Sequence, residues 1–190
     1  MRLTSPRIPP VEPAEWTEEQ RALLARKSAR GRPVKNIYKT LVQHPAARQA
    51  FAPWSGYILS SRNSLPARDR EILILRTGFL SRCGYEWAQH ALVARRAGLT
   101  DEEIGRVKAG LSAPGWSDRE QGLLSAADEL HRDQFITDRT WNSLRQHYAE
   151  MQCMDIVFTV GQYTLVSMFL NSFGVQLEPG QTIDSELRGG

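Results

Sequence analysis

The sequence is poor in cysteine: Cys83 and Cys153 are the only two in 190 residues. A secreted scaffold of this size that relied on disulfides would usually carry more, so we expect a reducing, cytoplasmic location. The first ten residues contain no apolar segment of the kind that forms a signal peptide. The sequence therefore predicts a cytoplasmic protein that is long enough to be held together by a hydrophobic core without disulfides.

A strong charge of one sign is also missing. The chain has 24 Lys+Arg and 21 Asp+Glu, a net charge of +3, and no dense basic stripe interleaved with aromatic residues, so nucleic acid is not an expected partner. The longest apolar run, residues 151–170, contains Asp155 and several uncharged polar residues. A lipid-facing helix tolerates an acid poorly, so this run predicts a buried or interface helix rather than a membrane span.

Strand signals are absent as well, because no short alternating runs are separated by Asn-Gly or Asp-Gly. Helix starts are frequent, with capping boxes at Thr17, Thr100 and Ser117. The wide apolar face of residues 67–80 predicts a buried helix, although 72–75 alone could pass for a strand. The fold class is therefore all-α. The expected helices cover approximately residues 18–28, 37–42, 46–60 (kinked or split by Pro53), 67–80, 85–96, 101–109, 118–131, 138–149 and 153–170.

The ends of the chain differ from its middle. Prolines crowd the first sixteen residues, which predicts an extended arm in which Trp16 anchors to its own body or to a neighbouring subunit. We divide the chain into an N-terminal arm with the first helix (1–35), a helical domain (36–176) and a C-terminal tail (177–190).

One group of residues could carry chemistry. A helix turns by about 100° per residue, which places Glu86 about 300° and His90 about 700° around from Cys83, on one shared face. Glu71 precedes Cys83 by twelve residues and joins this face only if the chain bends near residues 81–84. Gly84 is the residue that makes such a bend plausible.

This group supports more than one chemistry. A carboxylate beside an imidazole suits proton transfer near neutral pH, and a thiol beside a histidine can become a nucleophile. The set offers too few soft or imidazole ligands for a usual zinc site, so no metal is expected. No dinucleotide-binding or phosphate-binding loop is present, so no cofactor is expected either. Taken alone, the Glu86–His90 pair could also be a solvated helix-stabilising pair, and Cys83 a small buried apolar residue.

Three segments, residues 65–76, 83–90 and 95–104, resemble the carboxymuconolactone decarboxylase family, which includes alkylhydroperoxidase D. The resemblance implies an all-helical fold and a homo-oligomer, often a trimer or hexamer. The peroxidase branch has a Glu, a Cys twelve residues on, a second Cys after two residues and then a His after three. Glu71, Cys83 and His90 fall on these positions, but Glu86 occupies the position of the second Cys.

A peroxidase that cycles between dithiol and disulfide needs that second cysteine. The resemblance therefore implies the decarboxylase branch, which works without cysteines, on a small organic acid or lactone. His90 would be the general acid/base, Glu86 its orienting group or a second proton carrier, and Glu71 a supporting carboxylate.

The same hypothesis needs a cation for the substrate carboxylate, for which Arg76 and Arg82 are the nearest candidates. Tyr85 and Trp87 are expected as pocket walls. Two alternatives stay open: a thiol peroxidase that uses Cys83, and a non-catalytic helical oligomer.

Overall fold

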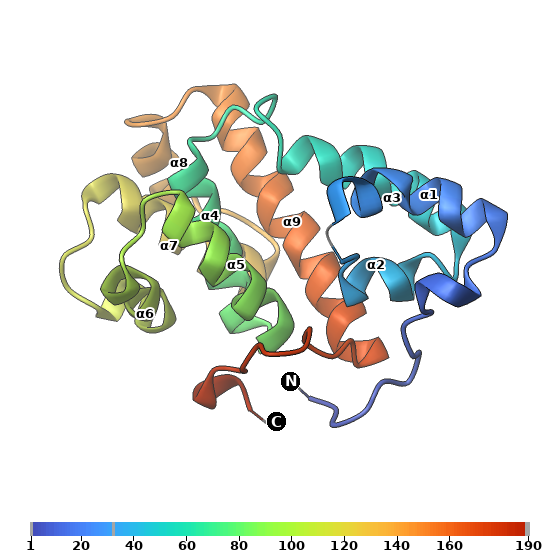
Figure 1. Cartoon of the computed structure of the whole chain (residues 1–190). Helices are drawn as coiled ribbons and strands as arrows, with labels where there is room; N and C mark the ends of the chain where they lie inside the picture. Colours follow the sequence, from blue (N-terminus) through green and yellow to red (C-terminus); the bar gives the residue numbers. More distant parts are fainter. Residues whose placement is uncertain (1, 32, 189–190) are drawn as a thin grey trace.

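The computed structural model describes residues 2–31 and 33–188. These residues form helices joined by loops, with no strand among them, which confirms the all-α prediction (Figure 1). The α-helices are α1 (Glu18–Ser28), α2 (Asn36–Leu41), α3 (Pro45–Ile58), α4 (Ala67–Leu80), α5 (Gly84–Arg96), α6 (Asp101–Ala109), α7 (Asp118–Asp133), α8 (Asp138–Arg145) and α9 (Glu150–Phe173), and the short 3-10 helices are η1 (Pro13–Glu15), η2 (Ala29–Gly31), η3 (Gly110–Ser112) and η4 (Ser185–Leu187).

The helix boundaries follow the capping signals. Thr17, Thr100 and Ser117 each accept a hydrogen bond from the backbone N–H three residues on, in complete capping boxes. The largest differences from the prediction are in three helices, of which α9 begins at Glu150 and ends at Phe173, three residues further out at each end than expected. Helix α8 ends at Arg145, four residues early, and α3 continues through Pro53 as one helix. Pro53 is exposed, so water can reach the carbonyl that has lost its N–H donor.

Helices α4 and α9 form the centre of the molecule. Helix α4 contacts α5, α6, α7 and α9, and residues 72–75, which alone could have formed a strand, are fully buried within it. Helix α9 also packs against α3, α5, α7 and α8 and runs diagonally between the two halves of the bundle (Figure 1). The chemistry-bearing residues of α4 and α5 therefore lie against the helix that crosses the whole fold.

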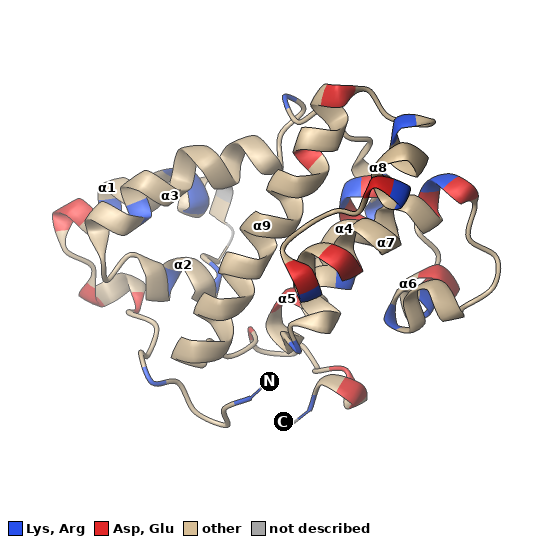
Figure 2. Cartoon of the chain, turned by 180° about the vertical axis from the view of Figure 1, so that it is seen from behind, with Lys and Arg blue, Asp and Glu red and all other residues tan. Residues whose placement is uncertain are grey.

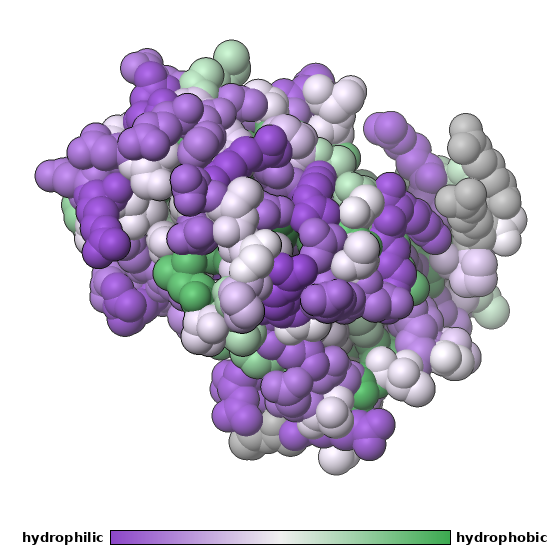
Figure 3. Space-filling model, turned by 90° about the vertical axis from the view of Figure 1, so that its left-hand side faces the viewer, coloured by the Kyte–Doolittle hydropathy of each residue, from purple (hydrophilic) through white to green (hydrophobic). Residues whose placement is uncertain are grey.

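Helix α9 is long and apolar enough, by length and composition only, to cross a membrane. Over half of its most apolar stretch is nevertheless buried inside the bundle, and the helix is almost free of charged residues beyond its first turns (Figure 2). Its Asp155 accepts hydrogen bonds from the Tyr57 hydroxyl at 2.6 Å and from Ser64. The face around α6–α8 is mostly hydrophilic (Figure 3). These features are those of a core helix in a soluble protein.

Both ends of the chain pack onto the body. The Arg7 backbone N–H donates to the Phe173 carbonyl at 2.9 Å, and Trp16 is buried in a cluster with residues of α1 and α2. Trp16 thus anchors the arm to its own body. The C-terminal segment is also fixed, because Leu187 is buried. The division at residues 35 and 176 stays a prediction, and its outermost residues, 1 and 189–190, lie outside the described part.

Candidate functional site

The site depends on the tight turn that joins α4 to α5. The Cys83 N–H donates to the Gly78 carbonyl at 2.8 Å, and the Arg82 N–H donates to the Phe79 carbonyl at 2.9 Å. Arg82 has a φ of 52°, in the left-handed region that non-glycine residues seldom occupy. The predicted bend is therefore present, but Arg82 makes it rather than Gly84, which is the first residue of α5.

The bend brings Glu71 of α4 to His90 of α5. The Glu71 Oε2 lies 2.8 Å from the His90 Nδ1, and the two side chains are 1% and 12% exposed. The Tyr163 ring of α9 packs edge-on against the imidazole, with centroids 4.8 Å apart. A carboxylate on one ring nitrogen fixes which nitrogen carries the proton and leaves the other for a reacting molecule.

Glu86 supplies a second buried carboxyl on the same side of α5. Its Oε2 accepts a hydrogen bond from the Ser167 hydroxyl at 3.0 Å, and its Oε1 is buried without a hydrogen-bond partner among the described residues. Gly78 leaves room for it, because a Cβ there would lie 2.9 Å from Oε1. Burial raises the pKa of Glu86 well above its usual value, the Ser167 bond lowers it, and the nearby Glu71 charge raises it further. The shift favours a protonated carboxyl that can act as an acid.

This shift makes stability depend on pH. As the pH rises above 4.5, the usual pKa of a glutamate, an unfolded chain loses the Glu86 proton while the folded protein keeps it. Unfolding therefore becomes progressively easier through the window between the two pKa values. We expect Glu86→Gln, which cannot ionise, to melt at a higher temperature than the wild type at pH 7, with the difference shrinking toward pH 4.

Thermal melts monitored by circular dichroism at pH 4, 5, 6 and 7 measure this effect. Glu102→Gln is the control, because it removes the same charge from a side chain that is 87% exposed. A Glu86→Gln variant that is less stable than the wild type by the same amount at every pH would contradict the burial of an ionisable Glu86.

Cys83 lies beside Glu86 in an environment that disfavours its thiolate form. The thiol is buried at the first turn of α5. Burial, followed by the Glu86 charge, raises its pKa to about 12, although hydrogen bonds with the Glu86 backbone and Ser167 counteract part of the rise. Cys153 is also a free, buried thiol, and it belongs to a different apolar cluster. Nucleophilic chemistry needs the thiolate, so this environment does not favour it.

Glu86 and His90 line a cavity of about 120 Å³ between α2, α3, α5 and α9. Tyr85, Gln89 and Tyr163 also line it, together with Lys35 at the start of α2. Glu178 of the C-terminal segment supports this wall by accepting hydrogen bonds from the Tyr85 hydroxyl at 2.6 Å and from the Gln89 amide. The cavity thus has two acid/base groups, an apolar lining and one cation.

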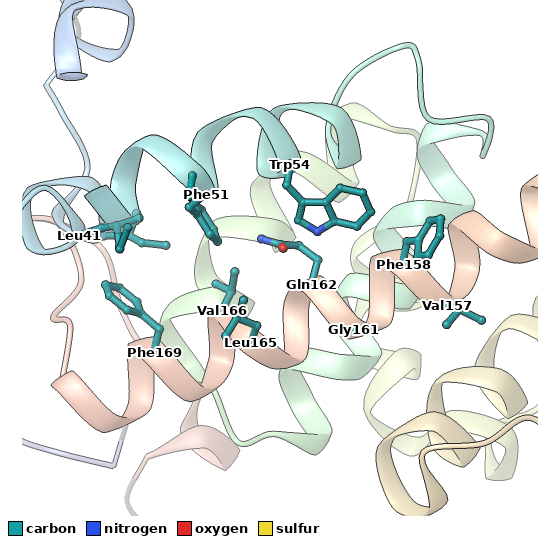
Figure 4. Close-up of a pocket in the computed structure, with 13 residues that line it drawn as sticks. Leu41, Phe51, Trp54, Val157, Phe158, Gly161, Gln162, Leu165, Val166 and Phe169 are labelled. Carbon is teal, nitrogen blue, oxygen red and sulfur yellow. The ribbon is translucent and has the colours of Figure 1, made fainter. Parts of the chain in front are cut away.

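A larger apolar groove of about 710 Å³ adjoins this cavity. Its walls are α3 and α9, with Leu41 of α2 at one end and Trp54 of α3 packed edge-on against Phe158 of α9 at the other, with ring centroids 5.3 Å apart (Figure 4). Gln162 lines both spaces, and its Oε1 is buried without a partner in the described part of the chain. Sequence analysis missed Lys35, Gln162, Tyr163 and Ser167 as site residues; for the last three, the signal was polar groups within the apolar run of residues 151–170.

Of the four predicted substrate-binding residues, only Tyr85 lines the cavity. Arg76 pairs with Asp128 at 2.5 Å and also donates to the Lys108 carbonyl. Arg82 is exposed at the turn. Trp87 packs on Phe79, with ring centroids 5.8 Å apart, in the other apolar cluster. We correct these three assignments, because Arg76 and Trp87 face the α6–α7 side of the bundle and Arg82 faces solvent.

Comparison with known proteins finds a matching family model and several solved structures with the same fold. A model of the carboxymuconolactone decarboxylase family matches residues 45–129. The uncharacterized protein YdfG of Bacillus subtilis (strain 168) is 24% identical over 105 residues, which cover 54% of this chain and 71% of that protein.

Two solved structures share the fold over nearly the whole chain. An uncharacterized peroxidase-related protein from Ralstonia eutropha JMP134, with an alkylhydroperoxidase AhpD core, superposes with a TM-score of 0.80 and 18% identity over 92% of this chain and 93% of that one. A variant of the debrominase Bmp8 in complex with 2,3,4-tribromopyrrole superposes with a TM-score of 0.75 and 12% identity over 93% and 94%. At these identities the likeness concerns the fold alone.

Proposed function

We propose that the chain, whose residues 45–129 match a model of the carboxymuconolactone decarboxylase family, is an enzyme that transfers a proton at carbon in a small organic acid or lactone. The observation that carries the proposal is the Glu71–His90 pair, 2.8 Å apart, whose imidazole lines the same cavity as Glu86. Acid/base sites typically contain pairs of titratable groups whose environments shift their pKa values apart, so that one group acts as the acid and the other as the base.

The roles follow from the contacts. His90 is the group that transfers the proton, and Glu71 holds its ring and stabilises the charged imidazolium. In a decarboxylation the bond between the substrate and its carboxylate breaks, CO2 leaves, and the electron pair moves into the unsaturated lactone. The carbon that gains this density takes the His90 proton, and Glu86, kept protonated by burial, is the second proton carrier that resupplies it.

The environment of Cys83 supports this reaction over thiol peroxidase chemistry. A peroxidase thiol must ionise before it attacks peroxide, and burial raises the pKa of Cys83 to about 12. Glu86 also occupies the position of the second Cys in the peroxidase pattern. We therefore expect Cys83 to be a packing residue beneath the site.

The test is turnover of carboxymuconolactone by the full chain in D2O. We expect release of CO2 and a product with one deuterium at the carbon that gains the electron density, next to the lactone carbonyl, as detected by NMR. Cys83→Ala is the matched variant and should keep kcat/KM within about threefold of the wild type. Loss of turnover in Cys83→Ala with unchanged folding, or rapid consumption of peroxide by the wild type, would overturn the proposal in favour of thiol chemistry.

The setting of the enzyme stays a prediction. We propose a cytoplasmic location from the two free thiols. We also propose self-association, with the exposed apolar side chains of α9 as its surface, namely Met151, Met154, Leu165 and Met168.

A further inference from the structure

Basic side chains gather around a cleft between α1, α2 and α3. The cleft encloses about 390 Å³, and its walls include Arg26 and Lys27 of α1, Tyr38 of α2 and Arg48 of α3, with no Asp or Glu. The acidic residues of α1, Glu18 and Glu19, belong to its first turn, at the opposite end of the helix. Figure 2 shows basic residues on α1, α2 and α3 around this region. The wall of the cleft thus holds three positively charged side chains, Arg26, Lys27 and Arg48, and its described residues include no acidic side chain that would neutralise them.

Arg48 is the unusual member of this group. Its side chain belongs to a residue that is only 5% exposed, yet the described part of the chain gives it no carboxylate partner. It makes one weak hydrogen bond, to the Leu23 carbonyl at 3.4 Å, and its Nε is buried without a partner. Its guanidinium lies 5.6 Å from the centre of the Tyr38 ring, which Lys27 also approaches, at 4.4 Å.

A buried cation without a counter-ion is costly to fold. Desolvation lowers the pKa of Arg48, and no carboxylate contributes to offset it. Such a group is stabilised when an anion enters the cleft, because charge-assisted bonds to a carboxylate use the donors that the protein leaves free. The cleft therefore has the charge and the unpaired donors of an anion site.

The cleft adjoins the cavity that holds His90. Tyr38, Phe51, Ser55 and Leu59 line both spaces, and Lys35 lines the cavity itself. An anion held at Arg48 would therefore lie beside side chains that also line the cavity of His90. This arrangement provides the cation that Arg76 and Arg82, at their positions in the fold, do not provide.

We propose that the cleft lined by Arg26, Lys27 and Arg48 binds a second carboxylate of the substrate whose other end reacts at His90. The inference rests on the proposed function and names the cations that would hold the carboxylate of carboxymuconolactone that does not leave as CO2. One carboxylate stays with Arg48 and Lys27, and the reacting part of the molecule enters the cavity.

The test measures binding rather than turnover. Tricarballylate, an unreactive tricarboxylate, is titrated into the full chain by isothermal calorimetry, with its uncharged triamide as the matched probe. We expect the wild type to bind tricarballylate and not the triamide, and Arg48→Met to weaken binding at least tenfold. Lys39→Met is the control, because it removes a nearby positive charge of α2 that is paired with Glu12 outside the cleft and should leave binding unchanged.

Met fills a buried site without a charge, so Arg48→Met should fold at least as well as the wild type, which a thermal melt checks. If it does not fold, the double variant Arg26→Met/Lys27→Met, at exposed positions, carries the test and should weaken binding by a similar factor. Unchanged binding in the folded variants, or inorganic phosphate binding as tightly as tricarballylate, overturns the proposal.

The two proposals fail in different ways. Binding that depends on Arg48 in a protein that releases no CO2 would remove the decarboxylase reaction and keep the anion site. Turnover of carboxymuconolactone with a KM that Arg48→Met leaves unchanged would keep the reaction and remove the anion site.

Discussion

Replacing His90 with Gln is expected to lower kcat/KM for carboxymuconolactone by at least about 100-fold, the usual effect of a positioned general acid/base. Gln keeps a polar side chain beside Glu71 but does not release a proton near neutral pH. Because His90 is partly exposed on the cavity wall, the substitution should leave the helical circular dichroism unchanged. Steady-state kinetics with a thermal melt measures both quantities.

His147→Gln is the matched control, because this histidine is exposed at the end of α8 and should keep full activity. Glu71→Gln tests what the carboxylate contributes to the Glu71–His90 pair. It leaves the ring in place but removes the charge that stabilises the imidazolium, so activity should fall while His90 is still present. Full activity in His90→Gln would remove this residue from the mechanism and leave the Glu71–His90 pair as a packing feature.

The parts of this fold that follow from local rules could be predicted from the sequence. Capping boxes at Thr17, Thr100 and Ser117 fixed three helix starts, because a cap involves residues only three apart. The shared face of Cys83, Glu86 and His90 followed from helical periodicity. Glu71 joined them only through a bend, and the residue that makes it, Arg82, carries no sequence signal for a left-handed backbone.

The parts that depend on distant segments could not be predicted. Glu178 reaches the wall of the cavity from the C-terminal segment, and Arg48 meets Tyr38 across two helices. No spacing rule links such positions, because their proximity is set by how whole helices pack. For the same reason the sequence predicts a substrate-binding role for Arg76 from its closeness to the site along the chain, although its side chain binds Asp128 of α7 and the end of α6.

Arg76→Met is expected to destabilise the protein by about 3–5 kcal/mol, because it removes one partner of a largely buried ion pair. The guanidinium makes two charged hydrogen bonds with Asp128 and caps the carbonyls of Val107 and Lys108 at the end of α6. Gly110 packs against it so closely that a Cβ there would lie 2.5 Å from Nη2. The loss removes these donors from Asp128 and from the Lys108 carbonyl, while the Val107 carbonyl keeps its hydrogen bond from the Gly110 N–H.

For a chain of this size the loss corresponds to a fall in Tm of about 6–20 °C, measured by calorimetry. Arg95→Met is the control, since it breaks an exposed pair with Asp101 and should cost about 1 kcal/mol or less. Below the melting transition, Arg76→Met should keep the KM of the wild type, because its side chain does not line the cavity. A normal Tm with a KM raised tenfold would show that Arg76 binds the substrate, and it would require a substrate cavity on the other side of α4.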